Sequence, residues 1–267
     1  MIDLGPGRIV EAKGADVGPF LHRLLTADLA GLPVGGVRRT ARLDDRGRLQ
    51  GVATVARTGP ARWWIVPDDG SGDAWWTFLD TYLFSEAVEL RVVDVHLSWR
   101  DGSIDAADEI DGLPRLPHLT TPSGGHEVAM AQPVEGGDRH VLERARIRAG
   151  RPRWPLDAPP SALPHEMGWV DEVVAFGKGC YIGQEAVHRI AVRGGVKRTL
   201  VGLALRGRPE VGSAVRVGGA DIGRVGSSEP DGDGYVALAV VRKPNDTVGT
   251  EVDVAGVAGR VVRLPMA

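Results

Sequence analysis

Hydrophobic and polar residues follow two different spacings in the N-terminal part of the chain, and the spacing predicts its elements. Between Asp16 and Leu29 the apolar residues recur at helical intervals, so we expect an amphipathic helix with Asp16 as its N-cap. A second helix of this kind is expected from Trp75 to Leu83. Helices that cover one face of an antiparallel sheet give an α+β fold. The expected strands are Val37–Leu43, Leu49–Ala56, Arg62–Val66 and Val88–Val95, the first two forming a hairpin.

The pattern changes twice further along the chain. From Asp101 to Pro133 it weakens to acidic, Gly-rich and Pro-rich segments that predict loops, and a helix is expected from Val141 to Ala149. After Lys197, short alternating segments with Gly-rich turns and no helix between them predict a small β-barrel. Its expected strands are Leu200–Leu205, Ala214–Val217, Asp221–Val225, Tyr235–Val241, Glu251–Val254 and Gly259–Leu264. We expect two interleaved α+β subdomains over residues 1–195, divided near 96–100, and the barrel over 196–267.

Composition and charge narrow the classes of function. The 267 residues carry a formal net charge of −3 with a pI near 6.2, so no general positive field would attract nucleic acid or anionic lipid. No signal peptide is recognisable, and no apolar run approaches the roughly 20 residues of a membrane span. We therefore expect a cytoplasmic monomer. Cys180 is the only cysteine, which excludes an intramolecular disulfide and a resident thiolate-bound cluster, and we expect no metal site.

One segment, Phe176–Arg189, concentrates the candidate chemistry. Its glycines allow close backbone approach, and a short helix is expected from Gln184 to Val192. Cys180 would lie just ahead of this helix, where backbone amides, the helix dipole and Lys178 would favour a reactive thiolate. A free cysteine is also among the most often buried residue types, so simple packing remains an alternative.

Two residues of the expected helix could recognise a heterocycle. The Gln184 amide and the Glu185 carboxylate together match the donors and the carbonyl acceptor of an amino-pyrimidine. Both also form i,i+4 pairs, with His188 and Arg189, which a solvated helix face explains equally well. The basic run from Arg144 to Arg153 could bind an anionic tail such as polyglutamate or form a charged helix edge. Three acidic pairs are expected in solvated turns: Asp44-Asp45, Asp68-Asp69 and Asp171-Glu172.

Residues 178–185 read Lys-Gly-Cys-Tyr-Ile-Gly-Gln-Glu. This string resembles the signature Lys-Gly-Cys-aromatic-x-Gly-Gln-Glu of the YgfZ family of folate-binding proteins, which is related to the glycine-cleavage T-protein. Residues 20–28, 43–48, 164–168 and 193–198 also resemble segments of that family. The resemblance covers most of residues 16–264 and is strongest over 140–205.

The resemblance implies a ring of α+β units and a small C-terminal β-barrel around a channel that holds tetrahydrofolate or a derivative. It implies a cytoplasmic accessory protein for iron–sulfur cluster assembly or repair, with consequences for tRNA modification. Its partners would be client iron–sulfur proteins or assembly factors, with no direct contact to nucleic acid. The resemblance also implies Cys180 and Lys178 as the reactive residues. The implied folate contacts are Tyr181, Gly183, Gln184, Glu185 and Arg189.

The chain departs from the T-protein pattern in two places. The acidic pair that T-proteins carry after the first hairpin turn matches Gly51 and Val52, so the acid–base group of an aminomethyltransferase is missing. Arg148 stands where T-proteins have a pteridine-binding glutamate. We therefore expect folate binding without conventional turnover. The alternatives are a folate-dependent aminomethyltransferase or demethylase, and a non-enzymatic interaction scaffold in which Cys180 is buried.

Overall fold

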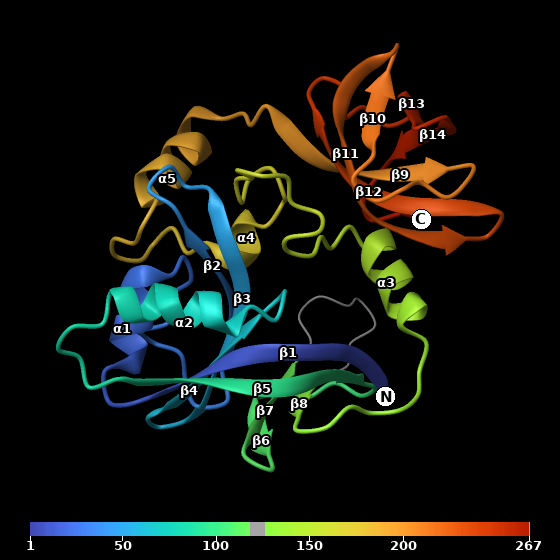
Figure 1. The fold of residues 1–267 in the computed structure, drawn as a ribbon. Helices are drawn as coiled ribbons and strands as arrows, with labels where there is room; N and C mark the ends of the chain where they lie inside the picture. Colours follow the sequence, from blue (N-terminus) through green and yellow to red (C-terminus); the bar gives the residue numbers. More distant parts are fainter. Residues whose placement is uncertain (118–125, 267) are drawn as a thin grey trace. The chain divides into compact units, whose positions relative to one another are not determined.

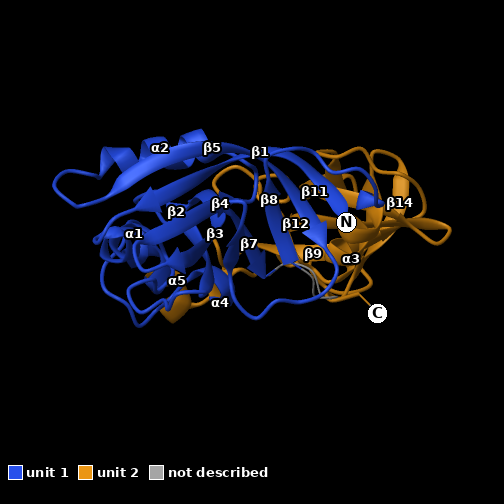
Figure 2. Cartoon of the chain, turned by 90° about the horizontal axis from the view of Figure 1, so that it is seen from below, with its two compact units in different colours: residues 1–119, 123–139, 171–188 blue, residues 120–122, 140–170, 189–267 orange. Residues whose placement is uncertain are grey.

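The computed structural model describes residues 1–117 and 126–266, which form two compact units (Figures 1 and 2). The first unit contains residues 1–117, 126–139 and 171–188. The second contains residues 140–170 and 189–266. The chain therefore leaves the first unit, returns to it for the segment 171–188, and then enters the second unit again.

An antiparallel sheet of eight strands forms the first unit, in the order β2-β3-β4-β1-β5-β8-β7-β6. Helices α1 (Val17–Leu24) and α2 (Gly72–Thr81) bury their apolar faces in a core with this sheet, in which Phe20, Trp75 and Leu79 are fully buried. This arrangement confirms the α+β fold expected from the spacing. The strands are β1 (Ile2–Lys13), β2 (Val37–Leu43), β3 (Leu49–Gly59), β4 (Arg62–Pro67), β5 (Glu89–Arg100), β6 (Asp108–Ile110), β7 (Leu113–Pro117) and β8 (His126–Met130).

The predicted hairpin is present, because β2 and β3 pair in register across the turn 44–48. The Asp44 carboxylate accepts hydrogen bonds from the backbone amides of Arg46 (3.0 Å) and Arg48 (2.8 Å), which closes the turn. The first helix is shorter than expected and ends at Leu24. Asp16 does not cap it with its side chain, because the carboxylate instead accepts a hydrogen bond from the Ala87 amide at 2.8 Å.

The sequence pattern missed strand β1, which lies between β4 and β5 near the middle of the sheet. Gly5, Pro6 and Gly7 interrupt its apolar pattern, although Pro6 still pairs with His96 of β5. No strand was expected among the loops and short apolar pieces from Asp101 to Pro133, but β6, β7 and β8 form within this range. Residues 118–125 of that range lie outside the described residues. Strand β5 continues through residues 96–100, where a subdomain division was expected.

The second unit contains a closed barrel of six strands in the order β10-β11-β12-β9-β14-β13, which confirms the predicted C-terminal barrel (Figure 1). Aliphatic side chains such as Leu203, Val215 and Val254 fill its interior. Helix α3 (Arg139–Arg148) packs outside the barrel through Ile147, which contacts Leu238. The strands are β9 (Arg198–Leu205), β10 (Ala214–Val217), β11 (Ala220–Asp231), β12 (Gly234–Arg242), β13 (Glu251–Val254) and β14 (Val257–Val262).

The described residues contain neither a helix suited to span a membrane nor a cluster suited to hold a metal ion. None of their helices is both long and apolar enough to cross a membrane. No group of three or more histidine, cysteine, aspartate or glutamate side chains in residues 1–117 and 126–266 is arranged to hold a metal ion.

Candidate functional site

The segment that carries the signature lies between α4 (Val170–Val173) and α5 (Gln184–Arg193). Thr26, which follows α1, ties the start of this segment to the first unit. Its backbone carbonyl accepts a hydrogen bond from the Ala175 amide at 3.0 Å, and its hydroxyl donates to the Val173 carbonyl. The position of the segment therefore depends on residues about 150 positions earlier in the chain.

Lys178 fixes the first half of the signature. Its half-buried ammonium donates hydrogen bonds to the backbone carbonyls of His22, Leu25 and Ala27, the last at 2.9 Å. It also lies 5.1 Å from the centre of the Tyr181 ring. Burial lowers the pKa of Lys178 to about 8, with Asp28 acting in the opposite direction. Three carbonyls occupy the three donors of the ammonium, so this geometry gives Lys178 a positioning role.

Gly183 fixes the second half of the signature against the β2–β3 hairpin. Its φ is +82°, and a Cβ atom at this position would lie 2.4 Å from the carbonyl oxygen of Asp44. A Cβ added to Gly47 in the hairpin turn would meet the Ala186 side chain at 3.0 Å. Only glycine permits this backbone conformation together with this approach, because both depend on the absence of a side chain.

Cys180 and Tyr181 differ sharply in exposure although they are neighbours. Cys180 is exposed, so the alternative in which its side chain is buried is wrong. Tyr181 is only 7% exposed, and its hydroxyl has no hydrogen-bond partner among the described residues. Burial raises the pKa of Tyr181 to about 12, so the phenol is neutral at physiological pH. The thiol of Cys180 is therefore accessible to solvent, whereas the side chain of the next residue, Tyr181, anchors the loop in the protein interior.

The remaining predicted residues lie on α5, the expected helix after the cysteine. Glu185 and Arg189 are exposed, and no ion pair joins them in the part of the chain that the structure describes. The Gln184 side-chain amide lies 3.5 Å from the carbonyl oxygen of Gly179 and does not bond His188, whose ring packs beside Phe176 at 5.1 Å. The structure therefore brings Lys178 and Tyr181 together and leaves the polar groups of α5 accessible.

A buried ionic cluster in the first unit was missed by the sequence analysis. Arg39 of β2 forms an ion pair with Asp68, and its Nη1 lies 3.7 Å from Oε2 of Glu172. Burial, and then the charge of Asp68, raise the pKa of Glu127 on β8 to about 7, while Arg39 acts to lower it. Asp68 lies in a turn, as expected, but its side chain is only 13% exposed rather than solvated. These residues are distant in sequence, so no local pattern connects them.

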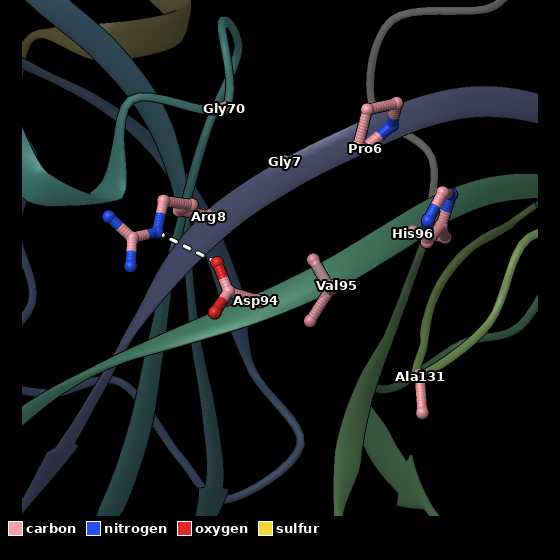
Figure 3. Close-up of a pocket in the computed structure, with 8 residues that line it drawn as sticks. All are labelled: Pro6, Gly7, Arg8, Gly70, Asp94, Val95, His96 and Ala131. Atoms are coloured by element: carbon pink, nitrogen blue, oxygen red, sulfur yellow. Dashed lines mark hydrogen bonds and ion pairs between the residues drawn. The ribbon is translucent and has the colours of Figure 1, made fainter.

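A cavity of about 410 Å³ lies over β1 and β5 in the first unit (Figure 3). Arg8 lines it, but its guanidinium is neutralised by Asp94 at 2.8 Å and Asp73 at 2.5 Å. The ring of His96 lies on the other side of Val95 from Arg8, and its Nδ1 is buried without a partner among the described residues. None of the signature residues lines this cavity.

The basic run from Arg144 to Arg153 is engaged in ion pairs within the second unit. Arg146, only 6% exposed, donates hydrogen bonds to Asp157 (2.9 Å) and Glu143 (2.8 Å). Arg148 pairs with Asp231 and Arg153 pairs with Glu143. These contacts favour the charged helix edge over a site for an anionic tail.

Comparison with solved structures identifies the fold. Aminomethyltransferase T of the glycine cleavage system from Bartonella henselae superposes with a TM-score of 0.82, covering 98% of this chain and 86% of that chain at 20% sequence identity. The chain has a T-protein-like fold. No protein-family model matches the sequence.

Two curated relatives agree with the T-protein-like fold. The chain is 31% identical over 156 residues to an Arabidopsis thaliana protein named "Putative transferase At1g60990, chloroplastic", which covers 54% of the chain. The match spans only 35% of that protein's length. An aminomethyltransferase of Symbiobacterium thermophilum is 25% identical over 95% of the chain and 80% of its own length.

Proposed function

We propose that this protein binds a reduced folate and acts as an accessory protein in the assembly or repair of iron–sulfur enzymes, with Cys180 as the group that meets the partner. The observation that carries the proposal is the exposed thiol of Cys180 on a fixed loop. Lys178, Tyr181 and Gly183 anchor that loop on both sides of the cysteine. The fixed loop thus presents the thiol where a partner can reach it.

Folate binding is supported by the T-protein-like fold and by relatives named as aminomethyltransferases. The residues that we assign to folate are those of the signature and of α5. The Glu185 carboxylate and the Gln184 amide can accept from and donate to an amino-pyrimidine ring, and both are accessible. Arg189 could neutralise a carboxylate of the ligand. The aromatic ring of Tyr181 and the backbone turn at Gly183 would shape the edge of the site.

A conventional aminomethyltransferase is disfavoured at Gly51 and Val52, because neither residue carries a carboxyl group. Val52 is fully buried, and Gly51 pairs with Arg42 in the hairpin register. A second candidate function remains because of Glu127. A carboxyl group with a pKa near 7 can both take and give a proton at neutral pH, which is what a folate-dependent one-carbon transferase or demethylase needs.

Calorimetric titration with tetrahydrofolate, under reducing and anaerobic conditions, tests the folate site. We expect saturable binding to the wild type, at least about tenfold weaker in Glu185→Ala because one charge-assisted contact is lost. Glu251→Ala is the matched control, since Glu251 is an exposed glutamate on barrel strand β13. If tetrahydrofolate does not bind to the wild type, a non-enzymatic interaction scaffold becomes the favoured function.

A turnover assay separates the two folate-dependent candidates. The accessory protein is expected to bind folate without consuming an aminomethyl or methyl donor. If turnover is found and Glu127→Gln abolishes it while folate binding persists, the one-carbon transferase replaces our proposal.

A further inference from the structure

Arg42 is half-buried and has no charged partner among the described residues. It lies near the end of β2, two residues before Asp44, against whose carbonyl the signature residue Gly183 packs. In residues 1–117 and 126–266, no carboxylate lies within 4.0 Å of its guanidinium, and no group accepts a hydrogen bond from it. The other arginine on β2 whose side chain is buried, Arg39, has its ion partners in place. Arg42 is therefore an exception that needs an explanation.

Two aromatic rings hold the guanidinium in place. Its central carbon lies 5.6 Å from the ring centre of Trp75 and 5.6 Å from that of Phe78, both on α2. Nε of Arg42 is buried, whereas the two terminal nitrogens reach solvent. Aromatic contacts use the faces of a guanidinium and leave its N–H edge available for hydrogen bonds. The terminal nitrogens, which reach solvent, therefore remain available to a ligand while the rings contact the cation.

A second unsatisfied donor lies beside Arg42. Trp75 is fully buried, and its indole N–H has no acceptor among the described residues. A Cβ atom on Gly51, which pairs with Arg42 in the hairpin, would lie 2.7 Å from Arg42 Nε and 3.1 Å from Trp75 Nε1. Both donors therefore converge on the same stretch of β3, and the absence of a side chain at Gly51 makes this possible.

The arrangement costs stability unless a ligand compensates it. Burial lowers the pKa of Arg42, and the acidic group whose charge opposes this effect is Asp69. Asp69 forms no ion pair with Arg42 in the part of the chain that the structure describes, and its Oδ1 accepts hydrogen bonds from the Ser71 amide (3.1 Å) and hydroxyl (2.5 Å). The buried Nε of Arg42 and the buried indole N–H of Trp75, both without acceptors among the described residues, are unfavourable, and such costs concentrate at binding sites.

We propose that Arg42, Trp75 and Phe78 form an anion-binding subsite that takes a carboxylate or phosphate group of a ligand. The planar edge of the guanidinium matches two oxygens of either group, and the aromatic rings exclude water from its faces. None of the subsite residues is among those assigned to folate above, although Gly51, beside Arg42 and Trp75, matches one position of the T-protein acidic pair.

Nuclear magnetic resonance of the tryptophan indole N–H groups tests this subsite directly. Trp75→Phe assigns the signal, and the wild type is then titrated at constant ionic strength with inorganic phosphate and, separately, with γ-glutamyl-glutamate. We expect a saturable shift of the Trp75 signal with at least one of the two. Arg42→Met should raise the apparent Kd at least about tenfold, whereas Arg46→Met, a nearby exposed arginine in the turn, should leave it unchanged.

The two anions distinguish the source of the ligand. A response to phosphate alone indicates a phosphorylated ligand, a response to the peptide alone indicates a carboxylate, and either supports the subsite. No saturable shift in the wild type, or an equal shift in Arg42→Met, would overturn it. Arg42→Lys keeps the positive charge if the methionine variant does not fold, and is expected to bind the anion more weakly than the wild type because it lacks the planar edge.

Discussion

The side-chain ammonium of Lys178 lies 2.9 Å from the backbone carbonyl oxygen of Ala27, 151 residues earlier in the chain. The same ammonium also binds the carbonyls of His22 and Leu25, at the end of α1. These carbonyls belong to a stretch that leaves the helix and can no longer satisfy all its acceptors internally. Lys178 thus acts as a cap supplied from a distant segment, and it places the cysteine loop on that helix end.

Replacement of Lys178 is expected to reduce stability. Lys178→Met keeps the aliphatic stem but leaves three carbonyls without their donor, which should lower the free energy of unfolding by about 1–3 kcal/mol. Urea denaturation measures the change. Lys243→Met, at an exposed lysine, is the control and should change stability by less than about 0.5 kcal/mol. Equal effects of the two substitutions would contradict the capping role.

Two glycines of the same loop form a matched pair. Gly183→Ala forces a side chain into a positive φ and against the Asp44 carbonyl, so we expect a loss of about 1–3 kcal/mol from the backbone conformation alone. Gly179→Ala meets no atom within 4 Å and should be nearly neutral. Thermal unfolding of both variants checks the difference. A neutral Gly183→Ala would show that the loop does not pack on the hairpin.

Cys180 should react with a thiol reagent in the native protein. Its side chain is exposed, so we expect one equivalent of Ellman's reagent to be consumed without denaturant. Cys180→Ser supplies the blank, because it removes the only cysteine in the sequence. If the thiol of Cys180 reacts only in denaturant, the alternative of an interaction scaffold with a packed cysteine would be favoured again.

Glu127 should make stability depend on pH in an unusual direction. Its pKa is raised to about 7 in the folded state, above the value of an unfolded glutamate, so the folded state binds more protons between the two values. Its contribution to stability is therefore fully present below about pH 4.3 and is lost as the pH rises toward 7. In Glu127→Gln this loss should disappear.

Thermal unfolding midpoints at pH 5 and pH 7.5 provide the measurement for Glu127. The wild type is expected to lose more stability than Glu127→Gln over this interval, because the other titrating groups are shared by both proteins. Glu251→Gln, which alters an exposed glutamate, should behave like the wild type. Parallel curves for wild type and Glu127→Gln would exclude a proton on Glu127 near neutral pH.

Local pattern in the sequence was sufficient for much of the fold. The β2–β3 hairpin, the two helices on the sheet and the six barrel strands were all expected, because side-chain spacing and turn residues report directly on local backbone geometry. Strand β1 was missed where Gly5, Pro6 and Gly7 break the alternation. Its place in the sheet comes from pairing with β4 and β5, which are more than 45 residues away.

The sequence by itself determined the identity and order of the signature residues, the exposed or buried tendency of most strands, and the resemblance that those residues carry. The tertiary structure determined which groups each charged side chain contacts. It placed Lys178 on carbonyls at and just beyond the end of α1 and gathered Arg39, Asp68 and Glu127 from separate strands and loops. Among the described residues, it left Arg42 beside two rings without a carboxylate. The physical reason is that hydrophobic periodicity is local, whereas desolvation and ion pairing depend on groups that only folding brings within a few ångströms.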